Sequence, residues 1–561
     1  MKVVLVAVNS KYIHSNLAVK YLKAYTSDMQ YQCENMEFSI NDREERVVQE
    51  IINENPDMIG FSCYIWNIEF IKKVSTLIKL INPMIEIFYG GPETSFSPKE
   101  FLENNIGDYL IEGEGEETYR EFIEAKLDIG GSDKYKNVKG LYSKINDEIF
   151  YGGKRPLMDM SKIVFPYNQD DNLENKIVYY EASRGCPFNC KYCLSSTTHG
   201  VRFLDINRVF KELQFFINKN VKLVKFVDRT FNCNKKFANA IWDYLIQNGN
   251  ETSFHFEVSA DLFSKDSLEI LKKAPKGMFQ FEVGVQTTNN EILHNINRSI
   301  KFATIKEKVL ELNELNNIKQ HLDLIAGLPG EDFNSFRKSF NEVYEISPEE
   351  LQLGFLKLLK GSEMREESEK WGMVYSPYPP YEILRTKDIS YEELMILKKV
   401  EHMVDKYLNS GKFYKILDFF KYSDRFEDSF EFYYELSKFY DSKGYFKRSI
   451  SAVDYYELFL DFNRYIGAGD EDVLLDIIRY EYFSFNNTKW IPVFLRLDIS
   501  KEEERIIKER IMEEYSIKNI NKLSVFKFKH NIKKLIETRE IEEKYSYVVF
   551  ILNDIKKQIF V

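Results

Sequence analysis

The chain has 561 residues, of which 44% are hydrophobic and 29% charged. A single core rarely extends over that length, so we expect about three or four domains. No stretch reaches the roughly 18 uninterrupted apolar residues of a membrane span. The formal net charge of -11 argues against broad nucleic-acid binding. The apolar start, Val3–Val8, is too short for a signal peptide, so we expect a cytoplasmic protein.

Residues 1–135 alternate short apolar runs with amphipathic stretches. The runs Val3–Val8, Asp57–Phe61 and Ile85–Tyr89 predict strands, whereas Ser15–Tyr25 and Ile68–Ile81 predict helices. This rhythm predicts a doubly wound parallel sheet, in which ligands bind beyond the carboxyl ends of the strands. The candidate binding residues at those ends are Ser62, Gly90, Gly91, Glu112, Gly113 and Gly115.

Residues 136–175 read as a linker with a hairpin that turns at Asn146–Asp147. From residue 176 to 375 the alternation of strands and helices resumes. Six apolar runs predict strands, and each but the last precedes a helical stretch. These runs are Ile177–Tyr180, Leu223–Val227, Phe254–Val258, Phe279–Val285, His321–Ile325 and Leu351–Leu358.

Three of the six cysteines, Cys186, Cys190 and Cys193, fall within eight residues. Three thiolates so close together indicate a metal site. Zinc normally takes four protein ligands, whereas an iron-sulfur cluster held by three cysteines keeps one iron free for another ligand. The other three cysteines are scattered, which favours a reducing compartment over a disulfide framework.

The segment CPFNCKYC, residues 186–193, resembles the signature of the radical S-adenosylmethionine (SAM) superfamily. The resemblance implies a partial (β/α)6 barrel, a 4Fe-4S cluster on the three cysteines, and SAM that is cleaved reductively at the free iron. Tyr192 should then lie against the adenine. Glu257, Gln286 and Asp228 stand at predicted strand ends and are candidate SAM contacts. The usual G-G-E run after the second strand is replaced by Asp228-Arg229-Thr230.

The loops of residues 1–135 resemble the flavodoxin-like domain of cobalamin-dependent radical SAM enzymes. The resemblance implies that Ser62, the pair Gly90-Gly91 and the GEGEET stretch of residues 113–118 line the pocket for the cobalamin nucleotide tail. The D-x-H-x-x-G motif that supplies a cobalt ligand in other cobalamin domains is broken. His14 is present, but Tyr12 and Leu17 replace the aspartate and glycine.

Residues 376–561 lack a recognisable motif. Tyr391–Leu408 predicts a helix, and the region as a whole reads as mostly helical. The apolar runs Val493–Leu497, Val525–Lys529 and Tyr547–Leu552 alternate with charged helices and predict a small α/β cap. The role of this region and that of Cys233 stay open.

The leading hypothesis is a cobalamin-dependent radical SAM enzyme that methylates an unactivated carbon of an unidentified substrate. Such an enzyme needs an electron donor such as flavodoxin or ferredoxin. A cyclase or rearrangement enzyme that uses cobalamin without methyl transfer is the alternative. A methylthiotransferase needs three more cysteines in the N-terminal domain, where only Cys33 and Cys63 occur. A non-catalytic cobalamin sensor would not need the cysteine triad.

Overall fold

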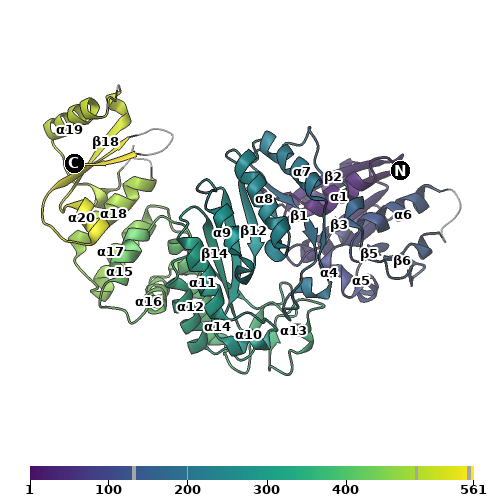
Figure 1. The fold of residues 1–561 in the computed structure, drawn as a ribbon. Coiled ribbons are helices and arrows are strands. Elements are labelled where there is room, and N and C mark those ends of the chain that lie inside the picture. Colours follow the sequence, from purple (N-terminus) through teal and green to yellow (C-terminus); the bar gives the residue numbers. More distant parts are fainter. Residues whose placement is uncertain (129–133, 199, 487–490, 518, 552–556) are drawn as a thin grey trace. The chain divides into compact units, whose positions relative to one another are not determined.

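The computed structural model describes residues 1–561 except 129–133, 199, 487–490, 518 and 552–556 (Figure 1). The chain divides into two compact units. One comprises Met1–Ser339 and Leu353–Leu394, and the other comprises Phe340–Gln352 and Met395–Val561. Among the described helices, none combines the length and the apolar character that crossing a membrane requires.

A sheet of seven strands forms the N-terminal part of the first unit, in the order β2-β1-β3-β4-β5-β6-β7. The first five strands are parallel, and the last two add antiparallel pairs at one edge. The strands are β1 (Lys2–Asn9), β2 (Gln32–Ser39), β3 (Met58–Ser62), β4 (Glu86–Gly90), β5 (Tyr109–Ile111), β6 (Leu141–Ile145) and β7 (Glu148–Tyr151). The helices are α1 (Leu17–Tyr25), α2 (Glu44–Asn53), α3 (Ile68–Ile81), α4 (Pro92–Ser95), α5 (Pro98–Asn104) and α6 (Glu116–Leu127).

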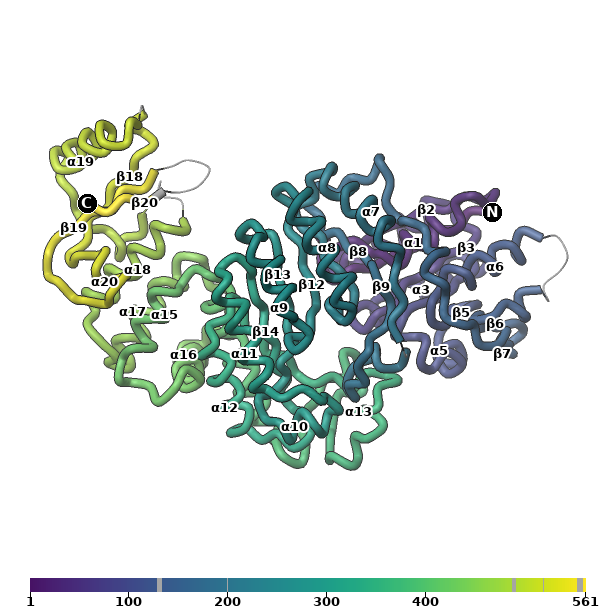
Figure 2. The backbone as a smooth tube through the Cα atoms, in the orientation of Figure 1, coloured from purple at the N-terminus to yellow at the C-terminus, as the bar shows by residue number. Residues whose placement is uncertain are grey.

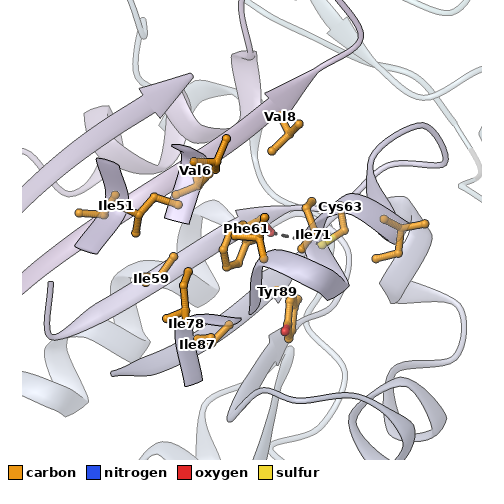
Figure 3. Packing of buried hydrophobic residues seen from close by; sticks show 14 of the residues in the cluster. Val6, Val8, Ile51, Ile59, Phe61, Cys63, Ile71, Ile78, Ile87 and Tyr89 are labelled. Carbon is orange, nitrogen blue, oxygen red and sulfur yellow. Dashed lines mark hydrogen bonds between the residues drawn. The ribbon is translucent and has the colours of Figure 1, made fainter. Parts of the chain in front are cut away.

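Both faces of this sheet are apolar and covered by helices. On one face, Val4, Val6 and Val8 pack with side chains of α2 and α3 such as Ile51 and Ile71 (Figure 3). On the other face, the alternate residues of β1 pack with α1 and α6. A strand buried on both faces must be apolar at consecutive positions, which explains the run Val3–Val8. The predicted flavodoxin-like, doubly wound sheet is confirmed.

The elements β2 and α2 were not among the predicted ones. β2 has the polar sequence QCENMEFS and lies at the edge of the sheet, where one side of the strand stays partly exposed. The hairpin of β6 and β7 is confirmed, and Asn146 and Asp147 turn it with φ of 50° and 63°. Two positive φ values are typical of the tight turns that match strand twist.

The second sheet has six strands in the order β15-β14-β13-β12-β11-β8, and all of them but the first residues of β15 belong to the first unit. This sequential order confirms the predicted partial (β/α)6 barrel. Its strands are β8 (Ile177–Tyr180), β11 (Leu223–Phe226), β12 (Ser253–Val258), β13 (Phe279–Gln286), β14 (Lys319–Ala326) and β15 (Glu350–Phe355). The helices between them are α7 (Ile206–Asn218), α8 (Lys235–Asn248), α9 (Lys265–Leu271), α10 (Asn290–Asn295), α11 (Phe302–Asn313) and α12 (Phe333–Tyr344).

The two faces of the barrel sheet differ in chemistry. One is built from buried aromatic residues such as Phe226, Phe256 and Phe281, which contact Trp242 of α8 or one another. The strand register places charged and polar residues together on the opposite face, which we call the polar face. It comprises Lys225, His255, Glu257, Gln280, Glu282, His321 and Asp323.

Short elements complete the first unit, and helices dominate the second. The short elements are β9 (Ser183–Arg184), β10 (Arg202–Phe203), α13 (Glu363–Glu366), β16 (Val374–Tyr375) and β17 (Ile383–Arg385). The helices of the second unit are α14 (Tyr391–Met403), α15 (Tyr414–Lys421), α16 (Ser429–Ser442), α17 (Asp454–Ile466), α18 (Glu471–Phe485), α19 (Lys501–Glu514) and α20 (Ile532–Thr538), with α14 beginning in the first.

A three-stranded antiparallel sheet of β18 (Leu523–Phe528), β19 (Ser546–Ile551) and β20 (Lys557–Phe560) confirms the small α/β cap. Leu552, the end of the predicted third run, lies outside the described residues. The strand predicted at Val493–Leu497 was wrong, because Val493–Leu495 forms a single 3-10 turn after Pro492. Val493 is 74% exposed, so the apolar run does not mark a buried strand.

Candidate active site

The three neighbouring cysteines lie in a loop whose ends are held together by a short ladder. After β8 the chain enters β9 (Figure 2), and β9 pairs antiparallel with β10. At the neck of this loop Gly185 has φ of 101°, and a Cβ atom there would lie 2.0 Å from the carbonyl oxygen of Gly200. Only glycine satisfies both conditions. We call residues 185–201 the cysteine loop.

The thiols of the cysteine loop are close enough to affect one another. Burial raises the pKa of Cys190, and Cys193 and Cys186 raise it further, while Arg298 lowers it. All three are half-buried free thiols. Cys186 Sγ lies 3.4 Å from Thr230 Oγ1, and the amide of Ser195 donates to Cys193 Sγ over 3.4 Å. Three soft ligands in one loop suit an iron-sulfur cluster with one open iron.

Neighbouring segments hold the middle of the cysteine loop in place. The Lys191 amide donates to the Ile296 carbonyl, and the Met364 amide donates to the Lys191 carbonyl. The Lys191 ammonium lies 2.8 Å from Glu367 Oε1. Asn297 donates through its side chain to the Asn189 carbonyl. These contacts hold residues 189–191, the middle of the cysteine loop, against α10, α13 and the residues that follow them.

Two of the predicted SAM contacts, Tyr192 and Gln286, share a neighbour in Arg298. Its guanidinium donates to the Tyr192 hydroxyl over 3.2 Å and to the Gly284 carbonyl over 2.9 Å. Gln286 has φ of 71° at an irregularity of β13 that shifts the strand register. Its Nε2 lies so close to Gly284 that a Cβ on that glycine would clash with it. Its buried Oε1 has no hydrogen-bond partner among the described residues. Such an orphaned acceptor suits a polar ligand.

The other two predicted SAM contacts lie in different surroundings. Asp228 is 1% exposed, and it accepts hydrogen bonds from the Ala182 amide and the Ser183 hydroxyl. Burial raises its pKa to about 7 despite these bonds. Asp228 therefore anchors the segment that leads into the cysteine loop. Glu257 lies half-buried on the polar face, where burial raises its pKa to about 7 and the nearby Arg229 lowers it.

In the N-terminal sheet, the predicted binding residues gather at the carboxyl ends of β3, β4 and β5. Ser62 is buried and accepts a hydrogen bond from Asn16 over 3.3 Å. Gly90 ends β4, and Gly91 follows with φ of 115°, at a position where a Cβ would lie 2.5 Å from the Cys63 carbonyl oxygen. These contacts bring the loops after β3 and β4 together.

The loop after β5 leaves open space at one glycine. Gly113 has φ of 71°, and no described atom lies within 4 Å of where its Cβ would be. Its amide donates to Ser95 of α4 over 3.1 Å. Gly115 begins α6 as its N-cap residue. Glu112 accepts a hydrogen bond from Tyr151 of β7 over 2.6 Å. The open glycine corner fits the close approach of a bulky ligand such as cobalamin.

Sequence reasoning missed an ion network that joins the loop after β5 to the cysteine loop. Arg184, directly before Gly185, lies 2.5 Å from Glu116 and 2.9 Å from Glu181. Arg202 lies 2.5 Å from Glu114 and donates to the Met158 carbonyl. Burial opposes ionisation of Glu114, but hydrogen bonds from Arg202 and the Met158 amide hold its pKa below the usual range. The only sequence signal was the acidic run GEGEE itself.

His14 and Cys233 have neighbours that bear on their roles. His14 Nδ1 lies 2.6 Å from the Tyr179 hydroxyl, and its backbone bridges to Ile177 of β8. His14 therefore links the loop after β1 to the first barrel strand. Cys233 lines a pocket of about 510 Å³ beside Pro187 of the cysteine loop, together with Phe203 and Lys235. Burial raises the Cys233 pKa to about 11.

Three family models match the chain in succession. A B12-binding domain matches residues 3–123, and the radical SAM superfamily matches residues 180–343. The chain therefore contains a B12-binding domain followed by a radical SAM domain. A third model, described as a protein of unknown function (DUF4080), matches residues 369–550.

Curated relatives of the chain include methyltransferases. A 2-(S-pantetheinyl)-carbapenam-3-carboxylate methyltransferase of Streptantibioticus cattleyicolor is 26% identical over 326 residues, which are 53% of this chain and 46% of the relative. The cobalamin-dependent radical SAM methyltransferase TokK of Streptomyces tokunonensis is 26% identical over 349 residues, which are 58% of this chain and 51% of TokK. The chain thus spans about half the length of these relatives.

Two solved structures share the fold. The radical SAM methyltransferase TsrM of Kitasatospora setae, solved with cobalamin and a 4Fe-4S cluster, has a TM-score of 0.58 at 16% identity and covers 68% of this chain and 82% of its own. The cobalamin-dependent SAM radical enzyme OxsB, solved with aqua-cobalamin, has a TM-score of 0.59 at 16% identity and covers 92% of this chain and 82% of its own.

Proposed function

We propose that the protein is a cobalamin-dependent radical SAM enzyme that transfers a methyl group to an unactivated carbon of its substrate. The observation that carries this proposal is the cysteine loop. It offers three thiols beyond the end of β8. Ion pairs of Arg184 with Glu116 and of Arg202 with Glu114 connect it to the loop after β5. A radical generator and a corrinoid pocket would then be neighbours, as a reaction that uses both cofactors needs.

The proposal assigns roles to this chain's residues. Cys186, Cys190 and Cys193 would hold a 4Fe-4S cluster, which supplies the electron for reductive SAM cleavage. Tyr192 and Gln286 would position SAM. Asp228 would hold the segment that leads into the cysteine loop, and Glu257 of β12 would be a further SAM contact. The residues toward cobalamin would be Ser62, Gly90, Gly91, Glu112, Gly113 and Gly115. The protein's part is orientation and the exclusion of water.

Residues 1–135 would form the cobalamin domain, 136–175 the linker, 176–375 the radical SAM domain and 376–561 a C-terminal domain. An electron donor such as flavodoxin or ferredoxin would reduce the cluster in the cytoplasm. One relative is named for a carbapenam carboxylate and another, of Methylococcus capsulatus, is a hopanoid C-3 methylase, so the substrate of this chain has to be found by experiment.

The test is anaerobic reconstitution with iron, sulfide and cobalamin, followed by assay with SAM and a reductant. We expect 5'-deoxyadenosine and S-adenosylhomocysteine, and a compound one methyl group heavier in a metabolite extract of the native host. Cys190→Ala should abolish cluster absorbance and SAM cleavage. Cys33→Ala, on β2, is the matched control and should keep both. SAM cleavage with an isomerised product would refute methyl transfer, and cleavage by Cys190→Ala protein would refute the cluster.

A further inference from the structure

The polar face of the barrel sheet contains a second group of possible metal ligands, separate from the cysteine loop. His255 of β12, Glu282 of β13 and His321 of β14 each offer one ligand atom, and these atoms lie within 4.8 Å of one another. The strand register explains the grouping, because Glu282 pairs with His321, and His255 lies two residues before the partner of Glu282. Three adjacent parallel strands thus present the three side chains to one point.

We propose that His255, Glu282 and His321 bind one divalent transition-metal ion of the Zn²⁺ or Fe²⁺ type. Two imidazoles and one carboxylate are a donor set that such ions prefer over Mg²⁺ or Ca²⁺. With metal–ligand distances near 2.1 Å, neighbouring ligand atoms in such a site lie about 3.4 Å apart. His255 Nε2 and Glu282 Oε2 already lie 3.2 Å apart. Rotation of the His321 side chain would bring in the third donor.

A second observation concerns the two ring nitrogens of His255. His255 is 6% exposed, and its buried Nδ1 has no hydrogen-bond partner among the described residues. A metal on Nε2, the nitrogen that faces Glu282, requires the ring proton to be on Nδ1, and no described donor competes for that position. Asp323 Oδ1 lies 3.7 Å from His321 Nε2. A carboxylate in that position can orient a metal-bound imidazole.

The competing interpretation is a plain ion network. Lys225 Nζ lies 3.5 Å from the same Glu282 oxygen that faces His255, so an ammonium can neutralise the carboxylate without a metal. Neither interpretation gives His255 Nδ1 a partner, so this nitrogen does not decide between them. The two interpretations predict different effects of removing the ammonium on metal affinity. A metal and Lys225 would compete for Glu282, so metal affinity should rise without Lys225, whereas a plain ion network gives no such rise.

Zn²⁺ binding to the full-length chain tests the proposal. The background is the variant C186A/C190A/C193A, which removes the thiols that would bind Zn²⁺ elsewhere. After dialysis we expect about one Zn²⁺ per chain by mass spectrometry of the metal, and a single site by calorimetric titration. Glu282→Gln or His321→Ala should weaken this site at least about a hundredfold, more than the loss of a supporting residue does. Lys225→Met should tighten it a few-fold.

The matched control is His294→Ala, which removes an exposed histidine of α10 and should leave Zn²⁺ affinity unchanged. Circular dichroism in chelator shows whether each variant folds, and Glu282→Gln keeps the side-chain shape if a histidine variant does not fold. The proposal is overturned if the background binds no Zn²⁺ beyond that bound by Glu282→Gln, or if Lys225→Met fails to tighten binding. Neither result bears on SAM cleavage, so the proposed function is tested separately.

Discussion

The N-terminal sheet and the barrel sheet bury their faces differently. In the N-terminal sheet, Val4 and Val6 on one face of β1 and Val3 and Leu5 on the other are all 0% exposed. In the barrel sheet, one face is a layer of buried aromatic residues, whereas the polar face is charged and mostly half-buried. A sheet buried on both sides can offer ligands only the ends of its strands. A sheet with one polar face can offer positions along the strands as well.

This difference is reflected in where the candidate site residues lie. Every candidate for cobalamin binding is at a strand end or in a loop. The candidates of the barrel include the cysteine loop and, near strand ends, Glu257 and Gln286, but also the group His255, Glu282 and His321 within strands. A charged side chain would therefore destabilise the N-terminal sheet, whereas in the barrel sheet it can form part of a site.

The largest expected effect comes from placing one negative charge in each sheet. Val6→Asp puts an unpaired carboxylate in the apolar core of Figure 3, and we expect it to lower the free energy of unfolding by more than about 4 kcal/mol or to prevent folding. Gln280→Glu puts a charge on the polar face, opposite His255 in the register, and should cost less than about 1 kcal/mol. Urea unfolding followed by circular dichroism measures both. Similar losses of unfolding free energy in the two variants would contradict the proposed difference between the two sheets.

A second prediction concerns Glu331, a buried acid in the segment between β14 and α12. Glu331 is 0% exposed; Thr287 donates to its Oε1 over 2.7 Å, and Oε2 has no partner among the described residues. Burial raises its pKa from 4.5 to about 8. The folded state therefore holds this proton more tightly, so stability is full below about pH 4.5 and falls as the pH rises to about 8.

Glu331→Gln removes that titration while keeping the side-chain shape. We expect the variant to be about 2 kcal/mol or more stable than the parent at pH 8.5, and close to it near pH 4.5. Urea unfolding across this pH range provides the measurement. Glu269→Gln, at an exposed site on α9, is the control and should shift the curve equally at every pH. Parallel curves for Glu331→Gln and the parent would show that the buried carboxyl is not protonated.

A smaller effect is expected at the neck of the cysteine loop. Gly185→Ala and Gly200→Ala both place a side chain on a backbone with positive φ, which costs about 1–2 kcal/mol. Only Gly185→Ala also meets backbone atoms, since the Gly200 Cβ would lie in open space. We expect Gly185→Ala to lower reconstituted cluster content about tenfold, measured by iron and sulfide per folded chain, and Gly200→Ala to retain most of it. Equal cluster content in the two variants would contradict a role for the close approach.

The parts of this architecture that the sequence predicts are those encoded locally. Consecutive apolar residues mark the buried strands, glycines mark the loops, and the cysteine spacing marks a metal site. The polar edge strand β2 escapes such reasoning because its stability comes from pairing with β1. The apolar run at Val493 gave a wrong strand prediction, because apolar composition does not require burial.

Contacts between distant segments could not be predicted. The bond between Arg184 and Glu116 joins residues 68 positions apart, and neither is unusual in its own segment. The grouping of His255, Glu282 and His321 depends on the register of three strands, and a shift of one residue would turn a side chain to the aromatic face. Spacing along one segment predicts the cysteine loop, whereas the polar face required the structure.

The smallest effect we predict is on the reduction potential of the proposed cluster. Thr230 stands where the radical SAM family usually has a G-G-E run, and its Oγ1 lies 3.4 Å from Cys186 Sγ. A hydrogen bond to a ligating sulfur stabilises the more negative, reduced cluster, so Thr230→Val should lower the potential slightly. Redox titration followed by electron paramagnetic resonance measures the shift, and Thr304→Val on α11 is the control.

The outcome for Thr230→Val also decides which way its hydroxyl points. In the structure the hydroxyl donates to the Arg229 carbonyl over 2.8 Å, so its single proton is used within the loop. A ligating sulfur can only accept, and the hydroxyl would have to turn from Arg229 to Cys186 when the cluster is bound. A lowered potential in Thr230→Val would show that it turns. An unchanged potential would show that the hydroxyl stays on Arg229, and that the contact with Cys186 is one of packing.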